Sequence, residues 1–392
     1  DLVAVLHKSQ HMAAKALGTI KAEWEEESLD LDHDSLFDHI LKVATESRVL
    51  ASEGELSVGK EASVKHIEST FEDPYIAHSP IENHTATAVM EEGRMKVWAS
   101  CQTPYPTKED IAEELGMDQK NVQLLPICVG GGFGGKIYNP QAIEAARLAK
   151  LTGKPVQVVY TREEEFLFDR LRPAGVVQVD AGLNEEGRIS YWDFTVHMSG
   201  GREAEHFYQI PHSRTSVRWA SEGTMGHPFY TGAWRAPSVN TNTFARESQM
   251  DILAVAAGMD PVEFRLIHLQ HDPRMAHVVK TGAEHFGWTS AKGPSGRGYG
   301  FAVGIDVGSY VVVFVEVEVD KGSGHVQVKR AVCCQDMGIG NIINIRDIDL
   351  VSAIANDLQL TLFSPLDKPG DNLGVTGPPD KVRTKGRCLK IF

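Results

Sequence analysis

The sequence predicts an α+β fold with long hairpins and with helices packed on sheets. Two observations carry this prediction. Glycine-containing turns between strand-like runs recur along the chain, and the helix-like runs have their own start and stop residues. The chain has 392 residues, 42% of them hydrophobic and 23% charged. That composition is typical of a folded globular protein with room for two or three hydrophobic cores.

Charge and cysteine content limit the class of protein. The formal net charge of −14 argues against a nucleic-acid partner, because such proteins gather Lys and Arg on one face. No apolar stretch reaches the roughly 18 residues of a membrane span. The five cysteines form no C-x-x-C pair, so we expect reduced thiols and no metal or cluster held by this chain's side chains. We expect a cytoplasmic protein. The periplasm is the alternative, because a sequence that starts at Asp1 without methionine is typical of a truncated or processed chain.

The first 60 residues predict an α/β piece followed by a linker. Residues 51–60 turn to Gly, Ser and Glu, which is typical of a connection between domains. The elements expected before it are a strand from Leu2 to Leu6, a helix from Met12 to Leu17 that Gly18 ends, a strand from Ile20 to Trp24, and a helix from Ser35 to Thr45.

Three hairpins are predicted after this piece. Each pairs two apolar or alternating runs across a turn that contains glycine. The runs are Thr87 to Met90 with Met95 to Trp98, Val176 to Val196 around Asn184 to Gly187, and Val311 to Val328 around Lys321 to Gly324.

Four helices have recognisable ends. Capping residues are expected at their starts and glycines just past most of their ends. We expect Thr107 to cap a helix that ends at Leu115, before Gly116. Asn139-Pro140 should open a second helix, Gln141 to Leu151, which ends before Gly153. Asn242 should open a third, Phe244 to Ala257, which ends before Gly258, and Asp260-Pro261 should open a fourth.

The glycine loop, Gly130 to Lys136, has five glycines in its first six positions. Glycine is costly to order, so such a cluster indicates positive φ angles or a backbone that lies against a ligand. The loop stands between a strand-like run, Val122 to Val129, and the helix from Gln141, which is the order of a phosphate-binding βαβ unit. A dinucleotide site would also need an acidic residue about 20 residues later, and residues 148–159 contain none.

A P-loop is also a poor match. The glycine loop fits G-x-x-x-x-G-K, but Ile137 stands where a P-loop needs Ser or Thr to bind Mg²⁺. A nucleotide-binding oxidoreductase is therefore the weaker alternative. Two other interpretations stay open: a turn without a ligand, and a loop whose backbone lies against a bulky cofactor with Phe133 as a wall.

Further blocks of sequence follow in a characteristic order. They are His78 to Ala88, Val129 to Lys136, Gly232 to Pro237, Phe244 to Asp251, and Ala257 to Arg265. Together they resemble the molybdopterin-binding subunits of the molybdenum hydroxylase family, which includes xanthine dehydrogenases, aldehyde oxidoreductases and isoquinoline 1-oxidoreductase. The resemblance implies the family's molybdopterin-binding fold for residues 61–270 and an incomplete second part for 271–340. Residues 1–50 resemble the end of its α/β hammerhead domain, and 341–392 match nothing.

The resemblance also implies a site. In the family, molybdenum is held by the dithiolene of molybdopterin and by no protein side chain, and the glycine loop lies beside it. Gly131, Gly132, Phe133 and Gly134 match the cofactor-binding positions. Gln102 matches a glutamine directed at a molybdenum oxo ligand, and Arg235 an arginine near the substrate, so both are implied as catalytic and cofactor-binding residues. The alternatives are that Gln102 is a turn residue at the end of a strand and that Arg235 forms an ordinary salt bridge.

Phe133, Ile137 and Trp234 are the implied substrate-pocket residues, although both aromatic rings could instead belong to a core. Ile137 stands where xanthine-oxidising relatives carry a glutamate, so an aldehyde or an N-heteroaromatic substrate is expected in place of a purine. The implied reaction is hydroxylation with water, which releases two electrons and two protons. Because this chain has no cysteines for a cluster, the electrons would pass to a partner subunit with a 2Fe-2S cluster, and further partners would be a flavin (FAD) subunit and a second molybdopterin-binding chain.

One expected residue is absent from the sequence pattern. The family's general base is a glutamate in a G-x-G-E-P-like turn, and the nearest string, Gly374 to Pro379, places Gly377 at that position. Three explanations stay open: the base lies on a second chain, the sequence is truncated or discontinuous, or the chain is a non-catalytic scaffold of the same fold.

Overall fold

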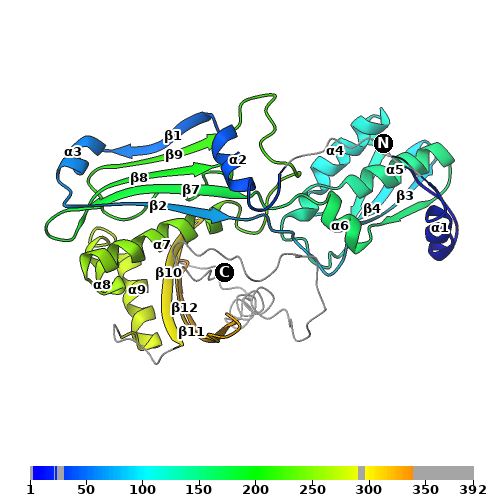
Figure 1. Cartoon of the computed structure of the whole chain (residues 1–392). Helices are drawn as coiled ribbons and strands as arrows, with labels where there is room; N and C mark the ends of the chain where they lie inside the picture. The colour runs from blue at the N-terminus through cyan, green and yellow to red at the C-terminus, as the bar shows by residue number, and fades with distance from the viewer. Residues whose placement is uncertain (1–2, 22, 24–30, 290–295, 339–392) are drawn as a thin grey trace. The chain divides into compact units, whose positions relative to one another are not determined.

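The computed structural model describes residues 3–21, 23, 31–289 and 296–338, which form two compact units (Figure 1). Of the described residues, those within Asp1–Val43, Pro74–Ala174 and Glu222–Pro237 form unit 1, and those within Ala44–Asp73, Gly175–Ser221 and 238–338 form unit 2. Both units contain sheets covered by helices, so the predicted α+β class is confirmed.

Unit 1 is built on a four-stranded sheet in the order β5-β4-β3-β6. The predicted first hairpin is β3 (Thr85–Glu91) and β4 (Arg94–Ala99), and it turns through Glu92 and Gly93, which both have positive φ. β5 (Val122–Pro126) is parallel to β4, and β6 (Val156–Val159) is antiparallel to β3. The helices of this unit are α1 (Gln10–Leu17), α2 (Leu36–Val43), α4 (Pro104–Leu115), α5 (Pro140–Thr152) and α6 (Arg162–Phe168).

Small side chains allow α5 to lie close to the sheet of unit 1. Ala142, Ala145, Ala146 and Ala149 on one face of the helix are fully buried, and so are Ala86 and Ala88 on β3. The spacing of the helical alanines, three or four residues apart, gives α5 a narrow apolar face. The chain reaches this helix directly from the glycine loop, through a single 3₁₀ turn, η2 (Gly135–Ile137), so the packing of α5 fixes the far end of the loop.

Unit 2 contains a five-stranded sheet, β1-β9-β8-β7-β2, and a three-stranded sheet, β10-β11-β12. Helix α7 packs on β7, β2 and β10, and α9 packs on β11 and β12. The hairpins β7–β8 and β11–β12 are those predicted from the sequence. The bounds are β1 (Glu46–Glu53), α3 (Leu56–Glu61), β2 (Lys65–Asp73), β7 (Gly175–Leu183), β8 (Ile189–His197), β9 (Ser213–Trp219), α7 (Val239–Ala257), α8 (Pro261–Ile267), α9 (Pro273–Phe286), β10 (Arg297–Asp306), β11 (Ser309–Val319) and β12 (Val326–Asp336).

Two predicted helix starts are wrong by about one turn. α4 begins after Thr103, and Thr107 lies inside the helix, where its hydroxyl accepts a hydrogen bond from the buried Asn139 side chain. α7 begins after Ser238 and not at Asn242, whose side chain donates to backbone carbonyls. In both cases a polar residue that resembles a cap is used for a tertiary contact. The helix-ending glycines Gly116, Gly153 and Gly258 are confirmed by their left-handed conformation.

The N-terminal elements differ from the prediction in two places. Val3 to Leu6 and Ile20 to Lys21 are not strands, and Leu2 and Trp24 lie outside the described residues. Residues 51–60, expected to be a linker, hold the end of β1 and most of α3. The reason lies at Gly59, where a Cβ would come within 2.6 Å of the Ser190 carbonyl oxygen and of Tyr191 Cβ. Glycine there permits close packing and does not mark a flexible connection.

A buried ion network joins α7, α8 and β10 in unit 2. The Glu247 carboxylate accepts hydrogen bonds from Tyr208 Oη at 3.0 Å and Arg265 Nε at 2.9 Å, and a longer one from Arg246 Nε at 3.3 Å. Arg265 Nη1 also pairs with Asp251 at 2.7 Å. The sequence blocks from Phe244 to Asp251 and from Ala257 to Arg265 therefore serve the structure of unit 2.

Two further observations concern the class of protein. None of the helices in the described residues has the length and apolarity needed to cross a membrane. Cys101, Cys128, Cys333 and Cys334 are free thiols, while Cys388 lies outside the described residues.

Candidate functional site

The glycine loop has an unusual backbone conformation within unit 1. Gly131 and Gly134 have φ of 96° and 110°, and Phe133 between them has a φ of 52°. A left-handed conformation costs a residue with a Cβ roughly 1–2 kcal/mol, so the surrounding contacts must hold Phe133 in place. Phe133 as a residue is nevertheless 38% exposed. The loop thus combines a strained backbone with a partly exposed aromatic residue.

Gln102 lies against the middle of the glycine loop. Its Oε1 accepts a hydrogen bond from the Gly134 amide at 3.0 Å, and its own backbone amide donates to the Lys136 carbonyl at 2.8 Å. A Cβ at Gly132 would lie 2.5 Å from Gln102 Oε1, so only glycine leaves room for this side chain. Because Oε1 is turned to the loop, the Nε2 donor group points elsewhere and has no hydrogen-bond partner among the residues described.

Three consecutive amides of the loop are available as donors. The N–H groups of Gly131, Gly132 and Phe133 make no hydrogen bond to any part of the chain that the structure describes. In contrast, the Gly135 amide bonds to the Gly132 carbonyl at 2.9 Å and the Gly134 amide bonds to Gln102. Unpaired amides in a row can together bind oxygen or sulfur ligands that carry negative charge.

The segment around Arg235 joins the loop from the other side. The Arg235 amide donates to the Phe133 carbonyl at 2.8 Å, and the Arg235 side chain is exposed. A Cβ at Gly134 would collide with the Ala233 carbonyl oxygen. Trp234 is half-buried, and the Arg172 guanidinium lies 5.5 Å from the centre of its ring.

Ile137 is held by hydrogen bonds of its backbone to Thr103, the residue after Gln102, and to Gly134. Its carbonyl accepts from Thr103 Oγ1 at 2.7 Å, and its amide donates to the Gly134 carbonyl at 3.2 Å. Gln102, Arg235 and Ile137 thus all contact the loop that carries Phe133. Trp234 precedes Arg235 in the chain and contacts Arg172.

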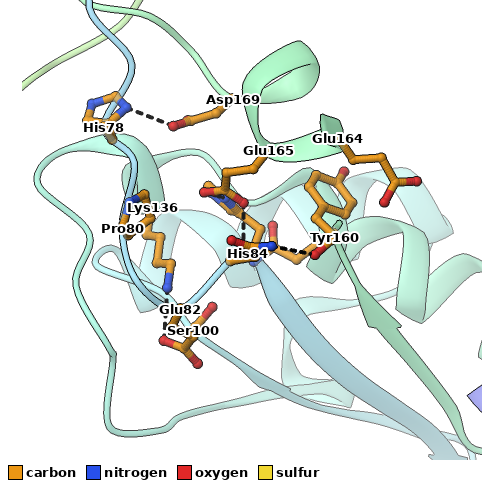
Figure 2. Close-up of polar contacts among 12 residues, drawn as sticks. His78, Pro80, Glu82, His84, Ser100, Lys136, Tyr160, Glu164, Glu165 and Asp169 are labelled. Carbon is orange, nitrogen blue, oxygen red and sulfur yellow. Dashed lines mark hydrogen bonds and ion pairs between the residues drawn. The ribbon is translucent and has the colours of Figure 1, made fainter. Parts of the chain in front are cut away.

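Lys136 is fully buried and paired with Glu82 (Figure 2). Its Nζ lies 2.9 Å from Glu82 Oε2, and the same oxygen accepts from the Gly130 amide at 2.6 Å. Burial would raise the pKa of Glu82, but the hydrogen bonds from Lys136 and Gly130 outweigh it and lower the pKa. A P-loop lysine must reach phosphate oxygens. Lys136 instead pairs with the partly exposed carboxylate of Glu82, which removes the main support for the nucleotide alternative.

His78 lies behind Gly134 and Gly135. Its Nδ1 is 2.8 Å from Asp169 Oδ2 (Figure 2). Its Nε2 is 2.8 Å from the Ala233 carbonyl oxygen. Both neighbours are oxygen acceptors, and each ring nitrogen faces one of them. A Cβ at Gly135 would come within 2.9 Å of His78 Nδ1, which explains the glycine there. His78 therefore links the loop to the segment that carries Arg235.

A second histidine–carboxylate pair lies beside the first. His84 Nδ1 is 2.9 Å from Glu165 Oε1 (Figure 2). His84 Nε2 is 3.2 Å from the Tyr138 carbonyl oxygen. Burial lowers the pKa of His84, but the hydrogen bond and charge of Glu165 outweigh it, so the net pKa is raised. Glu165 lies within α6, and Asp169 follows the C-terminal end of that helix.

These supporting residues were not predicted from the sequence. His78, Glu82 and His84 lie in the stretch that carries the resemblance, but no role was predicted for them, and neither was α6 with Glu165 and Asp169. Helix α6 begins with a capping box in which Thr161 and Glu164 bond to each other's backbone amides. That T-x-x-E signature is readable in the sequence and could have revealed the helix. Gly374 to Pro379, the string nearest to the general-base motif, lies outside the described residues.

Comparison with known proteins identifies the class. The family model of the molybdopterin cofactor-binding domain matches residues 42–269, which is more than half of the chain. The chain belongs to this family. Its resemblance to molybdopterin-binding subunits of molybdenum hydroxylases is thereby confirmed.

Curated relatives and solved structures agree with this family. The chain is 28% identical to a nicotinate dehydrogenase subunit of Pseudomonas putida over 381 aligned residues, which cover 86% of the chain and 32% of the relative. It is 30% identical to the aldehyde oxidoreductase molybdenum-binding subunit PaoC of Escherichia coli, covering 62% of the chain and 36% of the relative. Quinoline 2-oxidoreductase of Pseudomonas putida 86 has the same fold, with a TM-score of 0.63 at 17% identity over 82% of the chain and 48% of the solved one. The chain spans about a third of the length of these curated relatives.

Proposed function

We propose that the chain is the molybdopterin-binding part of a molybdenum hydroxylase that hydroxylates an aldehyde or an N-heteroaromatic compound with water. The observation that carries the proposal is the glycine loop itself. A Cβ at Gly132 would fill the space of Gln102, and the adjacent amides of Gly131, Gly132 and Phe133 have no hydrogen-bond partner among the described residues. These features fit a bulky group with electronegative ligands, which requires donors and room at the same place.

The residues of this chain would hold and surround that group. When bound, molybdopterin supplies the metal and the two-electron redox chemistry. The three amides and Gln102 Nε2 would donate hydrogen bonds to its oxygen or sulfur ligands, and Phe133 would cover one side. Arg235 is the proposed substrate residue, because an exposed guanidinium beside the loop can stabilise negative charge that develops on a substrate oxygen.

The proposed substrate class rests on the pocket residues and on the relatives. Ile137 contributes an apolar side chain, and Phe133 and Trp234 contribute flat rings, which suit an aromatic or aldehyde substrate better than a purine. Nicotinate dehydrogenase and quinoline 2-oxidoreductase carry N-heteroaromatic substrates in their names. Electrons would leave through a partner subunit with a 2Fe-2S cluster, with a flavin subunit as a further carrier. A second chain is the proposed source of the general base.

Metal and pterin analysis of the isolated chain and of its purified complex tests this proposal. We expect molybdenum and pterin in about equal amounts in the complex, together with oxidation of aldehydes or N-heterocycles by an artificial electron acceptor. Metal that appears only in the complex would support a site shared with a second chain. A complex without molybdenum would contradict the proposal and favour a non-catalytic scaffold, and one without iron would contradict the proposed electron path.

A further inference from the structure

A single carboxylate oxygen contacts both ends of the glycine loop. Glu82 Oε2 accepts from the amide of Gly130, the first residue of the loop, at 2.6 Å. The same atom accepts from Nζ of Lys136, the last residue, at 2.9 Å (Figure 2). The Glu82 amide also donates to the Gly130 carbonyl at 3.1 Å, so the loop is closed at its base by backbone and side-chain contacts together.

The energetics of this contact follow from the full burial of its Lys136 end. The Lys136 side chain has no exposed surface, whereas that of Glu82 is 28% exposed. Removing one partner of a buried pair leaves an uncompensated charge, whereas replacing both by neutral groups of similar shape is often nearly neutral for stability. A double variant can therefore recover stability while the contact that holds the loop ends is still missing, so the two roles can be measured separately.

We propose that the Glu82–Lys136 pair is a positioning pair that fixes the amides of Gly131, Gly132 and Phe133 for cofactor retention. The amides lie between the two ends that Glu82 holds, and they have no partner of their own among the described residues. Their direction therefore depends on the distance between the loop ends. This inference rests on the proposed function, because it assigns to the pair a consequence for the cofactor.

Hydrogen exchange tests the loop geometry without reference to the cofactor. The amides of Gly134, Gly135 and Ile137 are hydrogen-bonded to Gln102 or within the loop, and they report its order. In Glu82→Ala, both loop ends lose their acceptor, and we expect these amides to exchange about tenfold faster or more, as loss of hydrogen bonds to a charged group implies. Unchanged exchange in the full chain would overturn the proposal.

Cofactor retention and thermal stability are measured on the purified complex with three variants. Glu82→Gln and Lys136→Met should each lower the melting temperature and increase the rate of molybdenum and pterin loss on dialysis. The double variant E82Q/K136M should regain the melting temperature yet still lose cofactor about tenfold faster than the wild type, because no charged contact holds the Lys136 end. If the double variant retains cofactor as the wild type does, the pair has a structural role only and the proposal fails.

A matched control lies on the neighbouring hairpin. Lys96 and Glu91 form an exposed pair at 2.7 Å in the same unit, and E91Q/K96M should change neither exchange in the loop nor retention. A wild-type complex without molybdenum or pterin would contradict the proposed function and the retention effect together, and hydrogen exchange would still decide whether Glu82 orders the loop.

Discussion

The carbonyl oxygen of Phe133 accepts a hydrogen bond from the backbone amide of Arg235 at 2.8 Å. The glycine loop and the proposed substrate residue are thus joined through their main chains. The side chain of Arg235 does not form this link, so its substitution should leave the loop in place. Binding of the cofactor and binding of the substrate can therefore be tested separately.

Replacing Arg235 with methionine should reduce kcat/KM about 100-fold, the typical effect of removing one group that stabilises developing charge. Molybdenum and pterin content should stay at the wild-type level, because the backbone contact to Phe133 remains. Steady-state kinetics with an aldehyde and metal analysis of the same sample check both points. A parallel loss of pterin would contradict a role for Arg235 at the substrate alone.

Gly132→Ala should displace Gln102. The added Cβ would lie 2.5 Å from Gln102 Oε1 and 2.8 Å from its Cδ, and real Cβ contacts are essentially never that short. We expect loss of most of the bound cofactor and a fall in activity of at least about tenfold, since the displaced amide can no longer meet the Gly134 N–H. Gly304→Ala on β10 is the control, because nothing lies within 4 Å of the point where its Cβ would stand, and it should leave cofactor content unchanged. Equal cofactor content in both variants would argue against the proposed role of the loop.

Two histidines should give the unfolding free energy opposite pH dependences. The pKa of His84 is raised above 6.5 because the Glu165 contacts outweigh burial, so its contribution is complete below pH 6.5 and is lost as pH rises through the folded pKa. Burial lowers the pKa of His206 to about 4, so its contribution is present above pH 6.5 and is lost as pH falls towards 4. The unfolding free energy, measured with urea between pH 4 and pH 9, should therefore depend less on pH on the alkaline side in His84→Gln. In His206→Gln it should depend less on pH on the acid side. If His84→Gln changed the acid side and His206→Gln the alkaline side, the contacts described for these two histidines would not explain their pKa shifts.

Removing the Glu247 carboxylate should destabilise unit 2 strongly. Arg265 and Arg246 are both buried around it, so Glu247→Ala leaves buried guanidinium groups without their carboxylate, at a cost of about 3–5 kcal/mol. Asp306→Ala breaks an exposed pair with Arg202 and should cost less than about 1 kcal/mol. Urea midpoints of the two variants provide the measurement, and similar midpoints would mean that the network does not carry the expected energy.

The sequence predicted the elements whose signals are local. Glycines at helix ends and in hairpin turns act within a few residues, so the helix ends at Gly116, Gly153 and Gly258 and the three hairpins were predicted correctly. Thr107 and Asn242 misled because their side chains have partners far away in the chain, such as Asn139 for Thr107. Local propensity carries no information about such contacts.

The sequence pointed to the candidate site residues but not to the side-chain pairs that hold them in place. The resemblance pointed to Gln102, the glycine loop and Arg235, and the structure brings these three together in unit 1. Their roles towards cofactor and substrate stay predictions. The pairs His78–Asp169, His84–Glu165 and Glu82–Lys136 span 91, 81 and 54 positions in the sequence, so they could only be found from the folded chain.

The division of the chain into interleaved units has a consequence for synthesis on the ribosome. Gly175–Ser221, which belongs to unit 2, is translated between the glycine loop and the segment that contains Arg235. About 100 more residues must therefore emerge after the loop before its contacts with this segment can form. These contacts are Ala233 with His78 and Arg235 with Phe133. Nascent chains stalled before residue 222 should lack the complete site, and chains extended past unit 1's last residue, Pro237, with enough length to clear the exit tunnel should contain it.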